Sequence, residues 1–154
     1  MNRADASPPT APGAEPTIVM GFDYGARRIG VALGNAISRS ARGVGVIANG
    51  DHGPDWPRLD ALLREWSPQG LLVGLPLMID GAEQENSRAA RRFADELARR
   101  CGLPVQMVDE RHSSREAAQR FAGRRAGGSA RRKDAAALDA VAAEIIVERW
   151  LERD

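Results

Sequence analysis

Residues 20–35, MGFDYGARRIGVALGN, place a single aspartate, Asp23, between two apolar runs and follow it with a glycine-containing turn. Successive side chains of a strand point to opposite faces, so Asp23 shares a face with Val19 and Gly21. We expect the Asp23 side chain to project from a face of the sheet on which Gly21, having no side chain, leaves space. Such a face suits the approach of a bulky anion or a metal ion. The alternative is a turn aspartate that closes a hairpin, since Asp and Gly are common turn residues.

The rest of the chain alternates between strand-like and helix-like patterns. Apolar runs predict five strands, at 17–23, 28–34, 42–48, 70–76 and 103–110. Helical spacing predicts four helices, at 55–66, 87–102, 113–123 and 134–153. The short connections among the first three strands favour an antiparallel meander, and the helix-linked strands favour parallel pairing. This order predicts an α/β fold, a mixed five-stranded sheet with helices on both faces, which is the order of the ribonuclease H-like fold.

The composition indicates one domain. The chain has 154 residues and 43% hydrophobic content, enough for a single packed core. Residues 1–16 are rich in Pro, Ala and Ser and predict a disordered tail, which leaves 17–154 as the domain. The longest apolar run, LLVGLPLMI, has nine residues, far below the roughly 20 that span a bilayer, so no membrane association is expected. The single Cys101 excludes an internal disulfide and fits a cytoplasmic location.

Positive charge is concentrated in one part of the sequence. The totals of 22 basic and 21 acidic residues nearly cancel. The basic segment, residues 111–133, however, holds eight basic residues against one acidic residue. A solvated face is the alternative, but the glycines of this segment favour a mobile loop that contacts substrate. The candidate contacts to nucleic-acid phosphates are Arg27, Arg28, Arg111, Arg124, Arg125, Arg131, Arg132 and Lys133.

A second candidate substrate contact is the loop GLPLMIDG, residues 74–81. It follows a predicted buried strand, and we expect it to form a wall of the substrate site. Asp80 and Gly81 read as a turn and not as a ligand pair. The helix start at Asn86 and Ser87 is an alternative anion site.

Four segments in order resemble the YqgF family: FDYGARRIGVALGN, LLVGLPLMIDGAEQENSRAARRFADEL, VDERHSSREA and DAVAAEIIVERWLE. Cleavage of Holliday junctions and of pre-16S rRNA have both been ascribed to that family, and the resemblance covers residues 17–152. It implies a ribonuclease H-like nuclease whose divalent-metal site takes acids from the first strand, the DER segment and the last helix. On this sequence the implied catalytic and metal-binding residues are Asp23, Glu110 and Asp139.

The residues themselves leave two of these assignments open. Asp109 and Glu110 are neighbours on a strand and point to opposite faces, so the pattern alone does not choose between them. The resemblance selects Glu110, and Asp109 then reads as a strand-end acid that pairs with Arg111. Asp139 shares a helix face with apolar residues, where a carboxylate is costly without compensation. Asp134 is the alternative helical ligand, although it reads more simply as an N-cap.

Three converging carboxylates repel one another, and a cation relieves that repulsion. Carboxylate oxygens suit Mg²⁺ or Mn²⁺, which in a two-metal site activate water and stabilise the leaving oxygen. No protein nucleophile is then required. His112, close to Glu110, is a candidate helper in proton transfer, whereas His52 reads as a loop residue.

The predicted function is therefore metal-dependent hydrolysis of phosphodiester bonds in the 5′-end processing of pre-16S rRNA during ribosome biogenesis. The alternatives are a Holliday junction resolvase-type endonuclease and a non-catalytic RNA-binding protein. An actin-like ATPase is disfavoured because the chain is too short for a second, nucleotide-closing domain. We expect RNA as the favoured partner with branched DNA as the other, and a monomer or weak homodimer, because no apolar heptad indicates a strong one.

Overall fold

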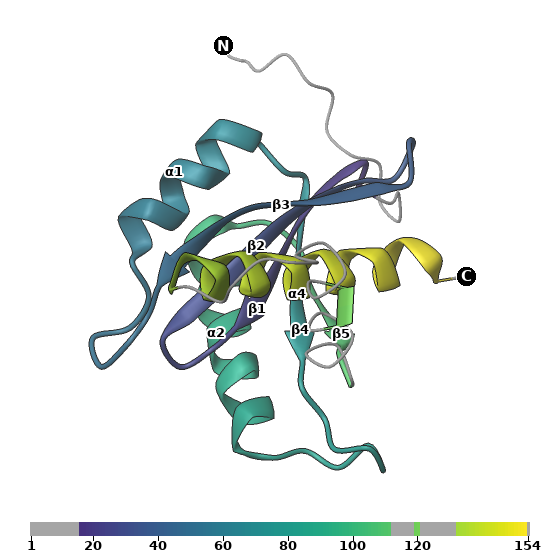
Figure 1. Cartoon of the computed structure of the whole chain (residues 1–154). Helices are drawn as coiled ribbons and strands as arrows, with labels where there is room; N and C mark the ends of the chain where they lie inside the picture. Colours follow the sequence, from purple (N-terminus) through teal and green to yellow (C-terminus); the bar gives the residue numbers. More distant parts are fainter. Residues whose placement is uncertain (1–15, 112–118, 121–131, 154) are drawn as a thin grey trace.

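A computed structural model describes residues 16–111, 119, 120 and 132–153, and for residues 132–136 it describes the backbone alone. The strands are β1 (Ile18–Tyr24), β2 (Arg28–Asn35), β3 (Ser40–Ala48), β4 (Gly70–Leu75) and β5 (Val105–Asp109). The helices are α1 (Trp56–Trp66), α2 (Glu85–Cys101) and α4 (Arg132–Glu152), as labelled in Figure 1. All eight elements occur where the sequence predicts them, within a few residues. Of the helix expected at 113–123, Gln119 and Arg120 are helical and the rest lies outside the described residues, as do tail residues 1–15.

The five strands form one mixed sheet in the order β3-β2-β1-β4-β5. β1 pairs antiparallel with β2, which pairs antiparallel with β3, whereas β1 and β4 are parallel, as are β4 and β5. Phe22 of β1 lies opposite Val31 of β2 and Val73 of β4. This confirms the ribonuclease H-like fold. The parallel strands β1, β4 and β5 end at the same edge of the sheet, where Asp23 and Glu110 lie.

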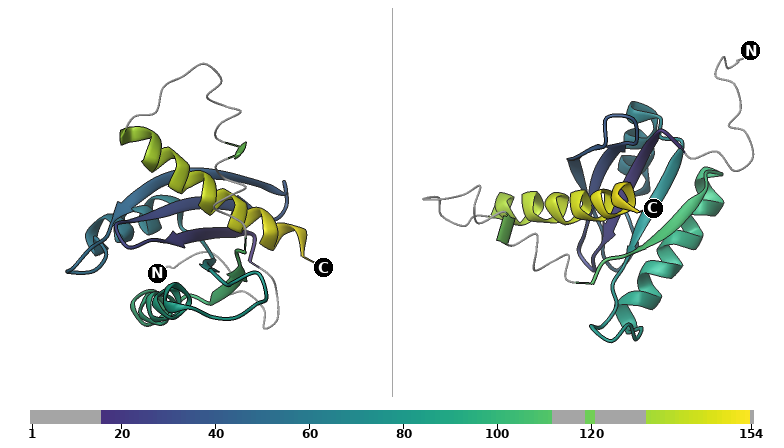
Figure 2. Two further views of the ribbon diagram at one scale, coloured as in Figure 1. Left: turned by 60° about the horizontal axis from the view of Figure 1, so that its bottom comes forward. Right: turned by 90° about the vertical axis from the view of Figure 1, so that its right-hand side faces the viewer.

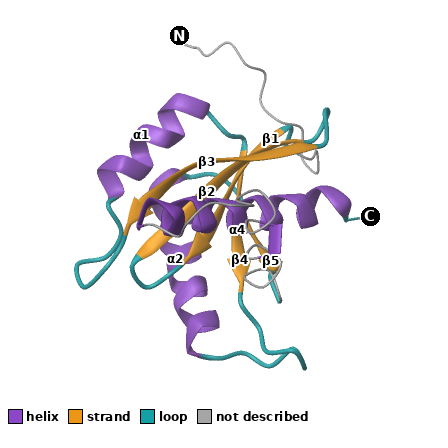
Figure 3. Cartoon of the chain, in the orientation of Figure 1, coloured by secondary structure: helices purple, strands orange, loops and turns teal. Residues whose placement is uncertain are grey.

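Helices cover both faces of the sheet, as expected. Figure 2 shows α4 on one side of the sheet and α2 on the other, and Figure 3 shows the same layers coloured by secondary structure. The larger core lies between the sheet and helices α1 and α2, where Phe93 contacts the rings of Phe22, Tyr24 and Trp56. The smaller core lies under α4, where Val147 and Trp150 pack on Val19 and Leu72. Each strand therefore sends alternate side chains to different helices.

Glycines let α4 lie close to the sheet. On this face the strands carry Gly21, Gly30, Gly34, Gly43 and Gly74, and an added Cβ at any of them would meet atoms of α4. At Gly21 it would lie 2.5 Å from Cγ2 of Val147. The expectation that Gly21 clears space for an anion or a metal ion is therefore wrong, because α4 fills that space.

Helix ends follow their local sequences, with one exception. The Asp55 side chain accepts a hydrogen bond from the backbone N–H of Arg58 and caps α1. Gly102 ends α2 with φ of 68°, a left-handed conformation that favours glycine. Helix α4 begins at Arg132, so Asp134 lies inside its first turn and is not the expected N-cap. No helix in the described ranges is both long and apolar enough to cross a membrane.

Candidate active site

A half-buried carboxylate, Asp23, and a buried one, Glu110, meet at the carboxyl ends of the parallel strands. Asp23 is near the end of β1, and Glu110 directly follows β5 and is only 6% exposed as a residue. The backbone N–H of Glu110 donates to the carbonyl oxygen of Leu75 at 3.1 Å, which continues the β4–β5 pairing by one residue. The side chains of Asp23 and Glu110 are hydrogen-bonded to each other. The structure thus joins residues that are 87 positions apart (110 − 23).

Alternation along β5 explains why Glu110 and not Asp109 reaches this site. Met107 packs in the core beneath α1 and α2, whereas Val108 packs beneath α4 and the Gln106 side chain accepts a hydrogen bond from Trp150. Glu110 therefore points to the α4 side, the side that carries Asp23. Gly74 makes room for it, since a Cβ there would lie 2.7 Å from Cδ of Glu110.

Loss of hydration changes the protonation of Asp23. Loss of hydration, together with the negative charge of Asp139, raises the pKa of Asp23 to about 6, although the hydrogen bond to Glu110 opposes this rise. A carboxylate that is costly to ionise in the absence of a cation gains when a cation arrives. The electrostatics of Asp23 thus favour a positive ligand.

Asp139 lies near this pair but is held by an arginine. Its carboxylate Oδ2 accepts a hydrogen bond from Nε of Arg28 at 2.6 Å, joining α4 to the start of β2. Residues Ala143, Ile146 and Trp150 of the same helix face are buried, which confirms the apolar stripe read from the sequence. The charge of Arg28 compensates the carboxylate within that stripe.

The donor set suits a hard divalent cation, although the three carboxylates are not assembled as a cage. Oxygen atoms of Asp23, Glu110 and Asp139 are the ligands that Mg²⁺ and Mn²⁺ prefer. Within the described ranges, no group of three or more His, Cys, Asp and Glu side chains is arranged to hold a metal ion. The structure brings Asp23 and Glu110 into contact and leaves Asp139 on Arg28.

Asp109 behaves as the sequence analysis expected of a strand-end acid. Its carboxylate forms an ion pair with Arg111, whose Nη2 lies 2.6 Å from Oδ2. Hydrogen bonds from Arg111 lower the pKa of Asp109. Arg111 also donates to the carbonyl oxygen of Ile79 at 3.0 Å, so this arginine links β5 to the loop after β4.

That loop forms a small hairpin. Leu77 pairs with Glu83 in an isolated bridge, and Gly81 adopts φ of 91°, which confirms the Asp80–Gly81 turn. Ser87 is fully buried and its hydroxyl donates to the carbonyl oxygen of Pro76. The Ser87 hydroxyl therefore holds the hairpin to α2, and the alternative anion site at Asn86 and Ser87 stays a prediction.

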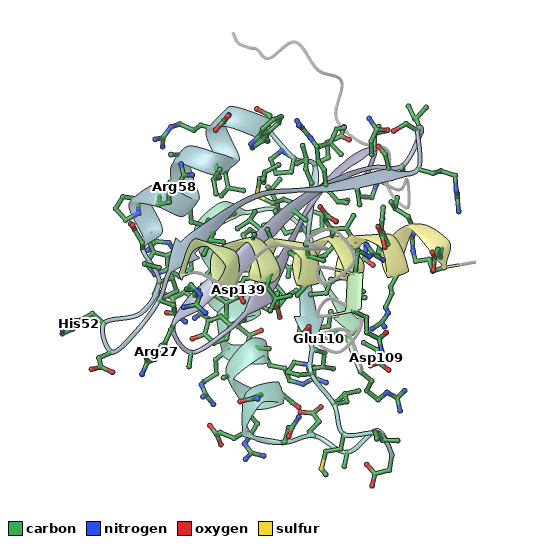
Figure 4. The ribbon with its side chains drawn as sticks, viewed as in Figure 1. Arg27, His52, Arg58, Asp109, Glu110 and Asp139 are labelled. Carbon is green, nitrogen blue, oxygen red and sulfur yellow. The ribbon has the colours of Figure 1, made fainter. Side chains whose placement is uncertain are left out.

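The candidate phosphate contacts divide by position. Arg27 is exposed in the turn between β1 and β2, and Figure 4 shows it with His52 at one end of the molecule. Arg28 and Arg111 are engaged with Asp139 and Asp109. Arg132 and Lys133 belong to the first turn of α4. Outside the described residues lie Arg124, Arg125, Arg131 and the candidate helper His112.

Sequence reasoning missed three contacts around the site. Asn49 donates through Nδ2 to the carbonyl oxygen of Gly25, and its backbone N–H donates to that of Arg27, so β3 supports the turn next to Asp23. Arg120 of the basic segment donates to both carboxylate oxygens of Glu148 and so braces α4. The Arg28–Asp139 pair was the third. Of these contacts, only that of Asn49 had a signal in the sequence, because a polar residue directly after a strand is a candidate for supporting a nearby turn.

Comparison with known proteins places the chain in a family. A protein of Xanthomonas campestris pv. campestris (strain B100), named "Putative pre-16S rRNA nuclease", is 56% identical over 133 residues, which cover 86% of each chain. One of the same name from Xanthomonas axonopodis pv. citri (strain 306) is 55% identical over the same length and share.

Solved structures give a weaker likeness. "Thermus thermophilus RuvC structure" has a TM-score of 0.48 and 16% identity, covering 87% of this chain and 93% of that one. "T. thermophilus RuvC in complex with Holliday junction substrate" has a TM-score of 0.46 and 16% identity, covering 86% of this chain and 92% of that one.

The model of the RuvX family, described as Holliday junction resolvase, matches residues 17–153. The chain therefore belongs to the RuvX family of nucleases, the YqgF family that its motifs resemble.

Proposed function

We propose that this protein is a metal-dependent nuclease that hydrolyses a phosphodiester bond in the 5′-end processing of pre-16S rRNA in the cytoplasm. One observation carries the proposal. Half-buried Asp23 and buried Glu110 are hydrogen-bonded at the edge where the parallel strands end, and loss of hydration raises the pKa of Asp23 to about 6. A pair of this kind fits a cation-binding centre, and the family consists of nucleases.

The proposed roles follow from the contacts. Asp23 and Glu110 would hold Mg²⁺ or Mn²⁺, and Asp139 would join them once its carboxylate leaves Arg28. The bound ion supplies an activated water and neutralises charge on the phosphate oxygens. Arg28, released from Asp139, and Arg27 would hold the substrate phosphate by charge-assisted hydrogen bonds. Residues 17–154 act as one domain in this proposal.

RNA is the preferred substrate and branched DNA the second candidate. The similar Xanthomonas proteins carry the pre-16S rRNA name, whereas the family description carries the junction name. Two symmetric cuts in a junction need two sites related by a two-fold axis, and hence a stable dimer. The chain has 5% aromatic residues, so contacts to the phosphate backbone and RNA shape outweigh stacking on aromatic rings.

The deciding experiment compares the two substrates in one buffer. Purified protein is incubated with Mg²⁺ or Mn²⁺ and either precursor 16S rRNA or a synthetic four-way DNA junction. We expect cleavage of the RNA and slow or unpaired nicking of the junction. Rapid, paired and symmetric incision of the junction with the RNA left intact would establish the resolvase activity instead. Binding without any cleavage would establish a non-catalytic RNA-binding protein.

Substitutions test the site itself. Asp23→Asn, Glu110→Gln and Asp139→Asn should each abolish cleavage while RNA binding persists, and double changes should add little, because the residues act as a unit. Asp134→Asn is the matched control and should cleave normally. If Asp134→Asn abolishes cleavage and Asp139→Asn does not, Asp134 is the helical ligand. Ca²⁺ should bind without supporting turnover, because it tolerates looser geometry than Mg²⁺.

A further inference from the structure

The hairpin after β4, residues 76–83, presents two large apolar side chains to solvent, and we call it the tip hairpin. Met78 is 52% exposed and Ile79 is 78% exposed. In the described part of the chain, the other strongly exposed large hydrophobic residue is Ile37, in the turn between β2 and β3. Adjacent exposed apolar side chains indicate a contact site more strongly than single ones do.

The tip hairpin is braced along its length. The backbone N–H of Met78 donates to the carbonyl oxygen of Ala82 at 2.9 Å, and the Asp80 carboxylate accepts from the N–H of Ala82 at 2.9 Å. At its base, Glu83 forms an ion pair with Arg91 of α2, at 2.6 Å. A loop held in this way presents its apolar side chains with little loss of conformational entropy on binding.

The tip hairpin also lies next to the candidate active site. It begins directly after Leu75, whose carbonyl oxygen accepts the hydrogen bond from Glu110. Arg111, the residue after Glu110, donates to the carbonyl oxygen of Ile79 at 3.0 Å. A group that contacts Ile79 therefore lies beside Arg111, the residue that follows Glu110 in the chain.

Two guanidinium groups lie beside the apolar Ile79. A hollow of about 370 Å³ is lined by Ile79, Asp109, Arg111 and Arg149. Arg149 of α4 donates to the carbonyl oxygen of Arg111 at 2.9 Å, which brings two guanidinium groups and one carboxylate to this hollow. The guanidinium groups of Arg111 and Arg149 beside the apolar Ile79 complement a nucleotide, which has an anionic phosphate and an apolar base face, and Asp80 of the tip hairpin also acts on Arg111.

We propose that the tip hairpin is a nucleotide subsite. Met78 and Ile79 contact the base of an unpaired nucleotide next to the cleaved bond, and Arg111 and Arg149 lie beside its phosphate. Apolar side chains inserted against bases are a known means of holding nucleic acid unstacked, and RNA offers such bases in loops and bulges. The inference rests on the proposed function and specifies its substrate as RNA with an unpaired nucleotide at the cut.

The test uses the full chain, with both tip residues changed by Met78→Ser and Ile79→Ser. Ile37→Ser is the matched control, because it removes a similarly exposed apolar side chain from the turn after β2, outside the tip hairpin. The probe is an RNA stem–loop with a single 2-aminopurine in its loop, titrated in Ca²⁺. The fluorescence of this base rises when it unstacks.

We expect the wild-type protein and the Ile37→Ser control to bind the probe and raise its fluorescence. The double variant should bind about 10-fold to about 100-fold more weakly, from the apolar area it no longer buries, and should lose the fluorescence rise. The slope of log affinity against log salt should not change, because serine replaces no charge. Thermal unfolding should be unaltered, since both side chains are exposed.

Other outcomes would overturn the subsite. Unchanged affinity and fluorescence in the double variant would do so while leaving the nuclease proposal intact. A wild-type dimer that becomes a monomer in the double variant, with RNA binding unchanged, would make the tip a protein contact. A wild-type protein that neither binds the probe nor cleaves RNA in Mg²⁺ would overturn both proposals.

Discussion

Replacing Asp23 with asparagine should stabilise the metal-free protein at neutral pH, even though it removes cleavage. In the folded chain, burial raises the pKa of Asp23 to about 6, whereas an aspartate in an unfolded chain titrates near 3.9. The folded state thus binds this proton more tightly than the unfolded state. Above pH 6 the ionised carboxylate destabilises the fold, and this cost disappears as the pH falls below 4.

The size of the effect follows from the difference of about two pH units. At 1.36 kcal/mol for each unit, the ionised carboxylate costs about 3 kcal/mol of the free energy of unfolding at pH 7.5. Asparagine carries no charge and its amide N–H can donate to Glu110, so the variant should recover much of that amount. For a chain of this size, about 3 kcal/mol raises the melting temperature by about 6–12 °C.

The assay is thermal or urea unfolding of both proteins in chelator, from pH 4 to pH 8. The stability advantage of Asp23→Asn should be largest at pH 7.5 and should vanish near pH 4. Added Mn²⁺ should then raise the melting temperature of the wild-type protein and have little effect on the variant. Asp109→Asn is the matched control with the opposite sign, because Arg111 lowers the pKa of Asp109 and stabilises its charge.

A destabilised Asp23→Asn variant at pH 7.5, or an advantage that does not change with pH, would refute this reasoning. Either result would mean that the ionised Asp23 does not destabilise the fold. The carboxylate would then be solvated or compensated, and the electrostatic argument for a cation at this site would fail.

Three further predictions concern the surroundings of the site. Gly74→Ala should cost about 1–3 kcal/mol of stability and weaken Mn²⁺ binding in calorimetry, because its Cβ would lie 2.4 Å from Cδ1 of Ile146 and 2.7 Å from Cδ of Glu110. Gly45→Ala, which would meet only Arg58 at 3.5 Å, should do neither, and equal losses in both would contradict the explanation. Arg28→Gln should strengthen Mn²⁺ binding because it releases the Asp139 carboxylate, and it should weaken RNA binding because it removes a phosphate contact. Weaker Mn²⁺ binding in this variant would show instead that Arg28 supports the site. Alanine at the four arginines within 124–132 should reduce the salt slope of RNA binding by about 0.7–0.9 for each phosphate that is no longer neutralised, and an unchanged slope would identify a solvated face.

Local periodicity made the order of elements and their faces predictable. Alternation with a period of two put Asp23 on one face of β1 and separated Asp109 from Glu110. Helical spacing put Asp139 on the apolar face of α4. These relations extend over a few residues, so the sequence carries them without knowledge of the fold, and the structure agrees with each of them.

The choice of Glu110 over Asp109 needed more than the pattern. Both faces of β5 are covered, so alternation separates the two acids without saying which one meets Asp23. The family resemblance selected Glu110, and the packing of β5 explains why, because Gln106 and Val108 face α4 and Glu110 follows them on that side.

The sequence by itself determined which elements form and which side chains share a face, whereas only the tertiary structure decided what each face meets. Gly21 suggests room for a ligand, but α4 lies over it and Val147 takes the space. Arg28 and Asp139 form an ion pair although they are 111 positions apart in the sequence. Asp23 and Glu110 are hydrogen-bonded although β4 lies between β1 and β5 in the sheet. The spacing of residues along the chain determines to which face of its own helix or strand each side chain points. Contacts between distant elements depend instead on which helix packs on which face of the sheet, and that is a property of the whole fold.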